Sequence, residues 1–332
     1  MAHVAGKAKT SKHSILIDST GLPNAGHMEL TAANIHNGAR SNEVRLVLAV
    51  DRKTGYPLYF RYVKGNVLDV NSLANTMTEL AQFGVEVDHC ILDAGYYCGD
   101  NIEDLHYWDI PYLFRLKAGN LTYQGLVKSY VDGLDTYDNR TIYGNRVVFI
   151  KRVPIEFHGK EAFAYVAIDH DVQAAERRSI YKKPPSEFAS VSDREEQLRT
   201  SGVFILISKL PVDENEILPL YYSRQAIEQA FDFGKNYANL LPLRTHCEET
   251  FRGHLLISFM ATVSIMSIDK MFMAAHPRAK NKNPFNFIQA RSCLRQMKCR
   301  VYDDYIYVTE PDRKSNDILK ALRIKCDLSI RR

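Results

Sequence analysis

The alternation of hydrophobic and polar residues in the first part of the chain predicts strands and helices in a definite order. Five short apolar runs predict strands, at 14–18, 44–51, 57–64, 85–93 and 112–116. Apolar residues at helical spacing predict two helices, at 70–83 and 101–107. The turn signal Lys53-Thr54-Gly55 joins the second and third strands into a hairpin. The predicted order is therefore three meandering strands followed by alternating helix and strand.

The pattern changes after residue 117. A period-two hairpin is predicted over 147–153 and 162–169, and a polar, basic stretch follows from Arg177 to Arg199. The apolar run at 203–208 then returns to strand character. We therefore expect residues 118–201 to be a β-rich insertion before the next helix.

Residues 221–235, YYSRQAIEQAFDFGK, predict one amphipathic helix. At 100° per residue, Tyr221, Arg224, Glu228 and Lys235 lie within about 60° of one another on its surface. The neighbouring stripe, around Ile227, is small or apolar and suits packing on a sheet. The pattern predicts a helix that packs through one stripe and presents an acid, two bases and a phenol on the next.

Composition and charge are those of an ordinary globular protein. The 332 residues are 45% hydrophobic and 25% charged, and the net charge of +4 permits a polyanionic partner without requiring one. The six cysteines include no C-x2-C pair, which indicates reduced thiols in the cytosol. The start of the chain has no apolar signal region. The apolar run Leu255–Met266 is too short and too rich in Ser and Thr for a membrane span, and predicts a buried helix.

The spacing Tyr-x2-Arg-x3-Glu-x6-Lys at residues 221–235 resembles the signature of a subgroup of DDE transposases from bacterial insertion sequences. The resemblance implies an α/β fold, a ribonuclease H-like mixed sheet with flanking helices, interrupted by the β-rich insertion. It also implies that Glu228 is the third catalytic carboxylate. In that fold the first and fourth strands are neighbours, so Asp18 and Asp93, at the predicted strand ends, would face each other.

The same resemblance assigns a role to each residue of the site. Three carboxylates at one point repel one another unless cations lie between them, and oxygen ligands suit Mg²⁺, with Mn²⁺ as a substitute. We expect Asp18, Asp93 and Glu228 to hold two such ions, which serve phosphoryl transfer. The remaining signature residues, namely Arg224, Lys235 and Tyr221, are expected to contact the DNA backbone.

The activity that the resemblance implies is metal-dependent cleavage and strand transfer of an insertion sequence. Its partners would be DNA, as transposon ends and target, and a second copy of the chain when assembled on DNA; no membrane partner is expected. Its place would be the bacterial cytoplasm, associated with the nucleoid. Only 17 residues precede Asp18, where relatives carry a DNA-binding domain, so we expect an N-terminally truncated form with weak, largely sequence-independent DNA binding.

The domain organisation expected from these patterns has four parts. They are the first catalytic part at 1–117, the insertion at 118–201, the second catalytic part at 202–275 and a basic C-terminal segment at 276–332. Two other functions fit the same sequence. One is a ribonuclease H-like metal-dependent DNA nuclease, which strand joining and a dimeric end complex would distinguish from a transposase. The other is an inactive DNA-binding remnant, against which the intact acids argue.

Overall fold

The computed structural model describes residues 12–26, 28–36, 39–275 and 286–331. The chain forms two compact units, Met1–Gln229 and Ala230–Arg332, so the boundary between them falls within one helix. The first unit contains a large mixed sheet and the second a smaller set of helices with a three-stranded sheet. Each unit is described by itself.

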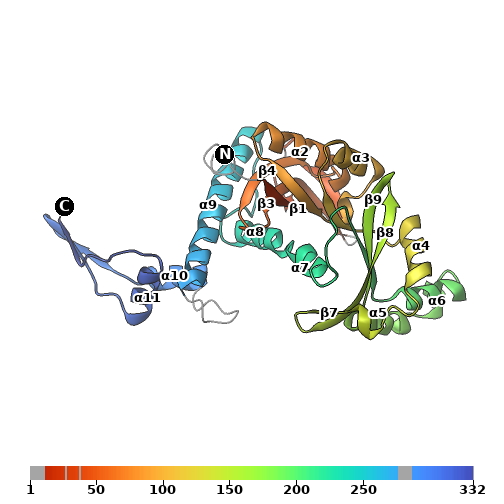
Figure 1. The fold of residues 1–332 in the computed structure, drawn as a ribbon. Helices are drawn as coiled ribbons and strands as arrows, with labels where there is room; N and C mark the ends of the chain where they lie inside the picture. The colour runs from red at the N-terminus through yellow and green to blue at the C-terminus, as the bar shows by residue number, and fades with distance from the viewer. Residues whose placement is uncertain (1–11, 27, 37–38, 276–285, 332) are drawn as a thin grey trace. The chain divides into compact units, whose positions relative to one another are not determined.

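The described part of the first unit is built on a ten-stranded sheet (Figure 1). Its order is β2-β3-β1-β5-β6-β10-β9-β8-β7, and β4 also pairs with β3. The strands are β1 (His13–Pro23), β2 (Ala32–His36), β3 (Ala39–Asp51), β4 (Pro57–Lys64), β5 (Val87–Leu92), β6 (Tyr112–Arg115), β7 (Arg140–Tyr143), β8 (Arg146–Phe157), β9 (Lys160–Asp169) and β10 (Val203–Ser208).

The pairing of the first strands confirms the predicted fold class. Strands β1, β5 and β6 are parallel neighbours, and β3 runs antiparallel to both β1 and β4. The order β4-β3-β1-β5-β6 is that of a ribonuclease H-like sheet. The sequence missed β2, because Ala32–His36 is a short strand with polar and small residues that pairs only with the beginning of β3.

The helices of the first unit contribute apolar side chains to the main core. Helices α2 (Leu73–Gln82), α3 (Gly99–Tyr107) and α4 (Leu121–Tyr130) pack on the sheet face that carries Ile15 and Ile17 of β1. Side chains alternate between the two faces of a strand, so Leu16 and Asp18 lie on the opposite face. The described residues of this unit also form four short 3₁₀ segments: η1 (Asp69–Ser72), η2 (Ala94–Tyr96), η3 (Tyr137–Asn139) and η4 (Pro185–Glu187).

Residues 118–201 extend the sheet. Strand β9 pairs antiparallel with β10, and β8 and β7 follow in order. Besides α4, this stretch forms α5 (His170–Lys182) and α6 (Val191–Thr200), where the sequence predicted only a polar, basic stretch. These two helices bury almost nothing apolar, apart from Ile180, so they lack the periodicity that predicts a helix. They begin instead with capping side chains, Asp169 for α5 and Ser190 for α6.

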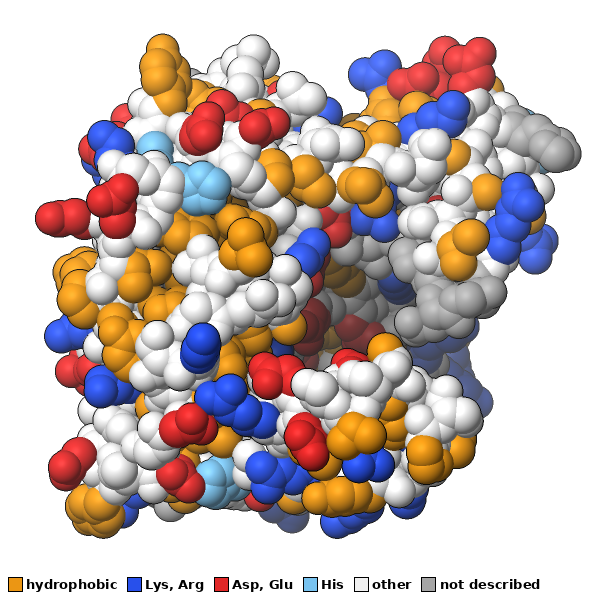
Figure 2. Space-filling model, turned by 90° about the vertical axis from the view of Figure 1, so that its right-hand side faces the viewer, with side chains coloured by type: hydrophobic (Ala, Val, Ile, Leu, Met, Phe, Trp, Pro, Cys, Tyr) orange, Lys and Arg blue, Asp and Glu red, His pale blue; other side chains and the backbone are white. Residues whose placement is uncertain are grey.

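Charged side chains are distributed without a large region of one sign on the face that Figure 2 shows. Blue Lys and Arg side chains alternate there with red Asp and Glu side chains. This agrees with the small net charge of +4. On this face the two signs are mixed, so it presents no large patch of positive charge to a polyanion.

The predicted single helix over 221–235 is wrong, because the chain forms two helices there. Helix α7 ends at Tyr222 (Ile217–Tyr222) and α8 begins at Gln225 (Gln225–Asn236), with Ser223 and Arg224 in a turn between them. The hydroxyl of Ser223 donates a hydrogen bond to the Leu220 carbonyl, 2.6 Å away. Such back-bonding competes with regular helical hydrogen bonds, and the backbone N–H of Arg224 bonds to the carbonyl three residues earlier, at 3.3 Å.

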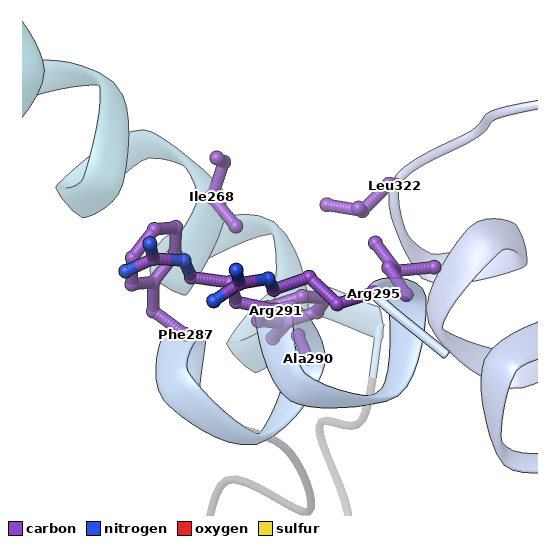
Figure 3. A pocket seen from close by; sticks show the side chains of 8 residues that line it. Ile268, Phe287, Ala290, Arg291, Arg295 and Leu322 are labelled. Atoms are coloured by element: carbon purple, nitrogen blue, oxygen red, sulfur yellow. The ribbon is translucent and has the colours of Figure 1, made fainter. Parts of the chain in front are cut away.

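The second unit has its own apolar cluster. Helices α9 (Glu248–Ala275), α10 (Phe287–Leu294) and α11 (Arg313–Ala321) meet around Phe272, Ala290 and Ile318. A groove of about 330 Å³ lies beside this cluster, where Ile268 and Leu322 meet Arg291 of α10 (Figure 3). The small sheet consists of β11 (Cys299–Val301), β12 (Tyr305–Val308) and β13 (Ser329–Arg331). Of the basic C-terminal residues, Arg278, Lys280 and Lys282 lie outside the described residues.

Helix α9 contains the apolar run for which the sequence predicted a helix. The apolar run Leu255–Met266 forms part of a 28-residue helix whose most apolar window has a mean hydropathy of 1.5 and is 39% buried. This helix is long and apolar enough to cross a membrane by length and composition alone. A single helix of this kind also occurs as the core helix of soluble proteins, so it is weak evidence for a span.

Candidate active site

The register of β1 on β5 brings two aspartates together. Ile17 lies opposite Leu92 in the last pair of this parallel ladder, and Asp18 and Asp93 are the next residues of their chains. Asp93 follows the end of its strand, as the sequence predicted. Asp18 does not, because β1 remains paired with β3 as far as Pro23. Beyond Ile17, β1 therefore stays paired with β3 but no longer pairs with β5.

One arginine joins the two aspartates. The Nη2 atom of Arg224 lies 3.2 Å from Asp18 Oδ2, and its Nη1 atom lies 2.9 Å from Asp93 Oδ1. The arginine side chain is 12% exposed, while those of Asp18 and Asp93 are 19% and 47% exposed. Charge-assisted hydrogen bonds of this kind are strong, and the flat guanidinium matches two acceptors at once. The break between α7 and α8 thus places a cation between the ends of two strands.

Tyr221 of α7 supports this arginine. Its hydroxyl accepts a hydrogen bond from Arg224 Nη1 at 3.1 Å, and the guanidinium carbon lies 5.5 Å from the centre of its ring. Tyr221 is buried, with 6% of its surface exposed. Burial raises the pKa of its phenol, so the phenol is neutral at physiological pH. In this structure the tyrosine positions Arg224 between the aspartates.

Burial dominates the electrostatics of Asp18. It raises the pKa of the Asp18 carboxyl from 3.8 to about 6, while Arg224 and the backbone N–H of Ser19, 2.8 Å away, act in the opposite direction. The negative charges of Asp93 and Asp69 add to the increase. A carboxylate that is buried beside other acids needs a cation. The pKa of Arg224 is itself raised: burial opposes its charge, but Asp93, Tyr221 and Asp18 outweigh the burial.

Asp69 is a further acid near the two aspartates, and the sequence did not predict it as a site residue. It begins η1, five residues after the last residue of β4, and accepts a hydrogen bond from the Ser19 hydroxyl. Arg45 of β3 lies 2.6 Å from the same carboxylate, so this charge is neutralised within the fold. A Cβ at Gly95 would lie 3.0 Å from Asp69 Oδ2, which ties this acid to the segment just after Asp93. Its position in the short segment that follows β4 was the available signal.

The structure brings together only part of the predicted constellation. Asp18, Asp93, Arg224 and Tyr221 are in contact through Arg224. Glu228 is exposed in the first turn of α8, and its backbone N–H bonds to the Arg224 carbonyl at 3.4 Å. Across residues 12–331, leaving out the gaps, no three acidic, His or Cys side chains are close enough to hold a metal ion. The roles of Glu228 and of Lys235, which is half-buried in α8, stay predictions.

The donor set of the aspartate pair fits a divalent cation. Asp18 Oδ2 and Asp93 Oδ1 both contact one positively charged group, so the pair offers two carboxylate oxygens to a cation. Hard cations such as Mg²⁺ and Mn²⁺ take oxygen ligands of this kind. The pair therefore suits the divalent metal ions that DDE transposases generally use.

A chain of hydrogen bonds at the other end of β1 resembles a hydrolase triad but has another explanation. The His89 ring lies 2.6 Å from the Ser14 hydroxyl and 2.8 Å from Asp88. The Ser14 oxygen also accepts a hydrogen bond from Arg52 at 3.1 Å, and Ser14 is the second residue of β1. A serine held in this way is not presented to a substrate, so this network joins β1, β5 and the turn after β3 structurally.

Comparisons with known proteins identify the family. A family model described as a transposase DDE domain matches residues 10–264. The piggyBac transposase, in a synaptic complex with hairpin DNA, is 11% identical with a TM-score of 0.44, and the similarity covers 78% of this chain and 47% of that one. The P element transposase of Drosophila, in a strand transfer complex, is also 11% identical, with a TM-score of 0.20 and coverage of 83% and 69%.

These structural similarities are too low to support an argument about function, and the chain spans about half the length of the piggyBac chain that it matches. No curated protein sequence matches the chain. The family match, by contrast, covers most of the described sheet and both aspartates. On that match, the chain belongs to the family of transposases with a DDE domain.

Proposed function

We propose that this protein cleaves and joins DNA strands as the transposase of an insertion sequence. The observation that carries the proposal is the convergence of Asp18 and Asp93, from two adjacent parallel strands, on a single cation. Family membership supports the same reaction class. A partly buried acid pair of this kind is costly to the fold, which favours a functional role over a structural one.

Two Mg²⁺ ions are the proposed cofactor, with Mn²⁺ as a substitute. When bound, such ions activate the attacking oxygen and stabilise the leaving oxygen in an in-line phosphoryl displacement. Asp18 and Asp93 would hold them through the oxygens that now contact Arg224. Glu228 would complete the site as third ligand and proton acceptor, which requires the first turn of α8 to approach the pair.

The cations of the signature would hold the DNA backbone. Arg224 and Lys235 would contact phosphates, and the Tyr221 hydroxyl would add a contact to the backbone. Arg224 contacts both aspartates, so its side chain is close to the proposed site of cleavage. The proposed partners are the transposon ends and the target DNA, with a second copy of the chain on the assembled ends. The proposed location is the bacterial cytoplasm, associated with the nucleoid.

A metal-dependent nuclease on the same fold is the second candidate function. It would use the same aspartate pair, whose geometry does not distinguish water from a DNA 3′-hydroxyl as the attacking group. An inactive DNA-binding remnant is disfavoured, since Asp18 and Asp93 are both present and converge. Strand joining is therefore the activity that separates the proposals.

The test is an assay with labelled DNA that carries the element's terminal repeats, incubated with a target plasmid and Mg²⁺. Wild-type protein is expected to nick the ends and to join them to the plasmid. Asp18→Asn and Asp93→Asn should abolish both steps and still show the circular dichroism spectrum of the wild type. Nicking without joining would favour the nuclease. Unchanged activity in either variant would refute the proposed site.

A further inference from the structure

We propose that Arg224 controls access of metal ions to Asp18 and Asp93. Its guanidinium occupies the pair in the absence of metal, and a metal ion binds only when the arginine is transferred to a DNA phosphate. Metal and DNA would therefore bind cooperatively. This inference rests on the proposed function, since it concerns the same aspartates.

The first argument is geometric. Arg224 uses Nη2 for Asp18 Oδ2 and Nη1 for Asp93 Oδ1, at 3.2 and 2.9 Å. The same two oxygens are those that converge on the cation position, so a metal ion between them would compete with the guanidinium. The arginine is only 12% exposed, so there is little room for both cations at once.

The second argument is the balance of charge. Asp18, Asp93 and Asp69 are three acids of this site, and Arg45 and Arg224 are the two arginines paired with them. Arg45 stays with Asp69, so departure of Arg224 would leave the Asp18–Asp93 pair with two uncompensated negative charges. A divalent ion restores neutrality. Each state thus has a cation beside the two carboxylates, of which Asp18 is the more buried, and the two cations can exchange.

The third argument concerns the arginine itself. Its Nε atom is buried and has no hydrogen-bond partner among the described residues. A guanidinium binds phosphate through a fork of adjacent N–H groups, and the unused Nε is available for such a fork once the side chain turns away from the aspartates. Arg224 also lies in the turn between α7 and α8, where backbone hydrogen bonds are irregular. The residue is therefore placed where its side chain can change partners.

The consequence is a reciprocal coupling between metal and DNA. If a DNA phosphate draws Arg224 away from the pair, then DNA raises the affinity for metal, and metal raises the affinity for DNA by the same factor. Without DNA the aspartates would bind metal weakly. With such coupling, Asp18 and Asp93 would hold metal mainly in the protein–DNA complex.

The test is isothermal titration calorimetry with Mn²⁺ on the full chain, without DNA. Arg224→Gln is expected to bind Mn²⁺ about tenfold more tightly than wild type, within the usual range of coupling effects. Arg224→Lys keeps the charge, but its single ammonium group cannot span both aspartates, so it should also bind more tightly than wild type. Arg199→Gln, which removes another arginine–aspartate pair (2.9 Å to Asp132), should bind as wild type does.

A second titration, with a duplex oligonucleotide present, measures the coupling between metal binding and DNA binding. The oligonucleotide should increase the Mn²⁺ affinity of wild type and leave that of Arg224→Gln nearly unchanged. Equal Mn²⁺ affinity in wild type and both Arg224 variants would overturn the inference. Tighter binding in Arg224→Gln alone would overturn it as well, because a general charge effect would then suffice.

The variants Asp18→Asn and Asp93→Asn distinguish a failure of the proposed control by Arg224 from a failure of the proposed function. If both variants lose Mn²⁺ binding while the Arg224 variants match wild type, the metal site stands and only the control by Arg224 is refuted. If no variant and no wild-type protein binds Mn²⁺, with or without DNA, the metal site itself is refuted, and the inference with it.

Discussion

Ile17 of β1 and Leu92 of β5 are the last partners of a parallel ladder, and each is followed by an aspartate. This register places Asp18 beside Asp93 on the sheet face opposite the one that α2 and α3 cover. Arg224 then reaches both carboxylates from the turn between α7 and α8. The site therefore depends on a short stretch of strand pairing and on a helix break far away in the sequence.

Asp18 should make the metal-free fold less stable as pH rises. Its pKa is raised from 3.8 to about 6, mainly by burial, so the folded state retains a proton that the unfolded chain has already lost. The contribution of Asp18 to the free energy of unfolding is therefore fully present below about pH 4, and it is lost as pH rises from about 4 to about 6. Asp18→Asn removes this loss, on the order of 3 kcal/mol above pH 6.

The measurement is urea unfolding of wild type and Asp18→Asn in the presence of a chelator. The stability difference in favour of the variant should increase between pH 4 and pH 7. A variant that is less stable than wild type at pH 7 would show that the pairing with Arg224 outweighs burial.

Glu228 should be required for catalysis and dispensable for folding. Its side chain is exposed on α8, and exposed substitutions usually change stability by less than about 0.5 kcal/mol. Glu228→Gln is therefore expected to keep the wild-type melting temperature and to lose Mg²⁺-dependent cleavage. Cleavage at the wild-type rate would exclude Glu228 as the third carboxylate.

Lys235 should contribute one phosphate contact. Lys235→Ala is expected to weaken DNA binding for all sequences alike and to reduce the salt dependence of log K by about 0.9. Lys53→Ala, at an exposed turn residue between β3 and β4, is the matched control and should leave the slope unchanged. Equal slopes for the two variants would contradict a phosphate role for Lys235.

Gly95→Ala should impair the site through Asp69. The added Cβ would lie 3.0 Å from Asp69 Oδ2, and that carboxylate would have to move although Arg45 and Ser19 hold it. We expect reduced cleavage together with a stability loss of about 1 kcal/mol. Gly125→Ala is the control, since its Cβ meets nothing within 4 Å and α4 should gain about 0.5–1 kcal/mol. Equal rates of DNA cleavage by the two variants would show that the position of the Asp69 carboxylate does not matter for the active site.

The sequence predicted the part of the fold that buried strands form. Apolar runs such as Val203–Ser208 are buried along their whole length, and their composition shows this directly. The pairing of β1 with β5, and hence the proximity of Asp18 and Asp93, was implied by the resemblance to a ribonuclease H-like fold, with which the order of strands and helices agreed. The polar helices α5 and α6 could not be predicted, because capping side chains and not an apolar stripe mark their beginnings.

The sequence misplaced the signature residues for a similar reason. A continuous helix from Tyr221 to Lys235 satisfied the apolar pattern, whereas the Ser223 side-chain hydrogen bond that accompanies the break is a local contact that periodicity does not detect. Consequently Arg224 was assigned to DNA alone, and its ion pairs with both aspartates became visible only in three dimensions. Asp69 was overlooked because its partners, Ser19 and Arg45, lie on other strands.

The most direct test of the account is a metal-specificity switch at Asp93. Asp93→Cys replaces a hard oxygen ligand with a soft sulfur, which binds Mg²⁺ poorly and accepts Mn²⁺ more readily. The measurement is DNA nicking by this variant and by wild type, with each metal in turn. If Asp93 is a metal ligand, the variant is inactive with Mg²⁺ and regains nicking with Mn²⁺, while wild type is active with both. Wild-type nicking by Asp93→Cys with Mg²⁺ would contradict the metal site at Asp18 and Asp93.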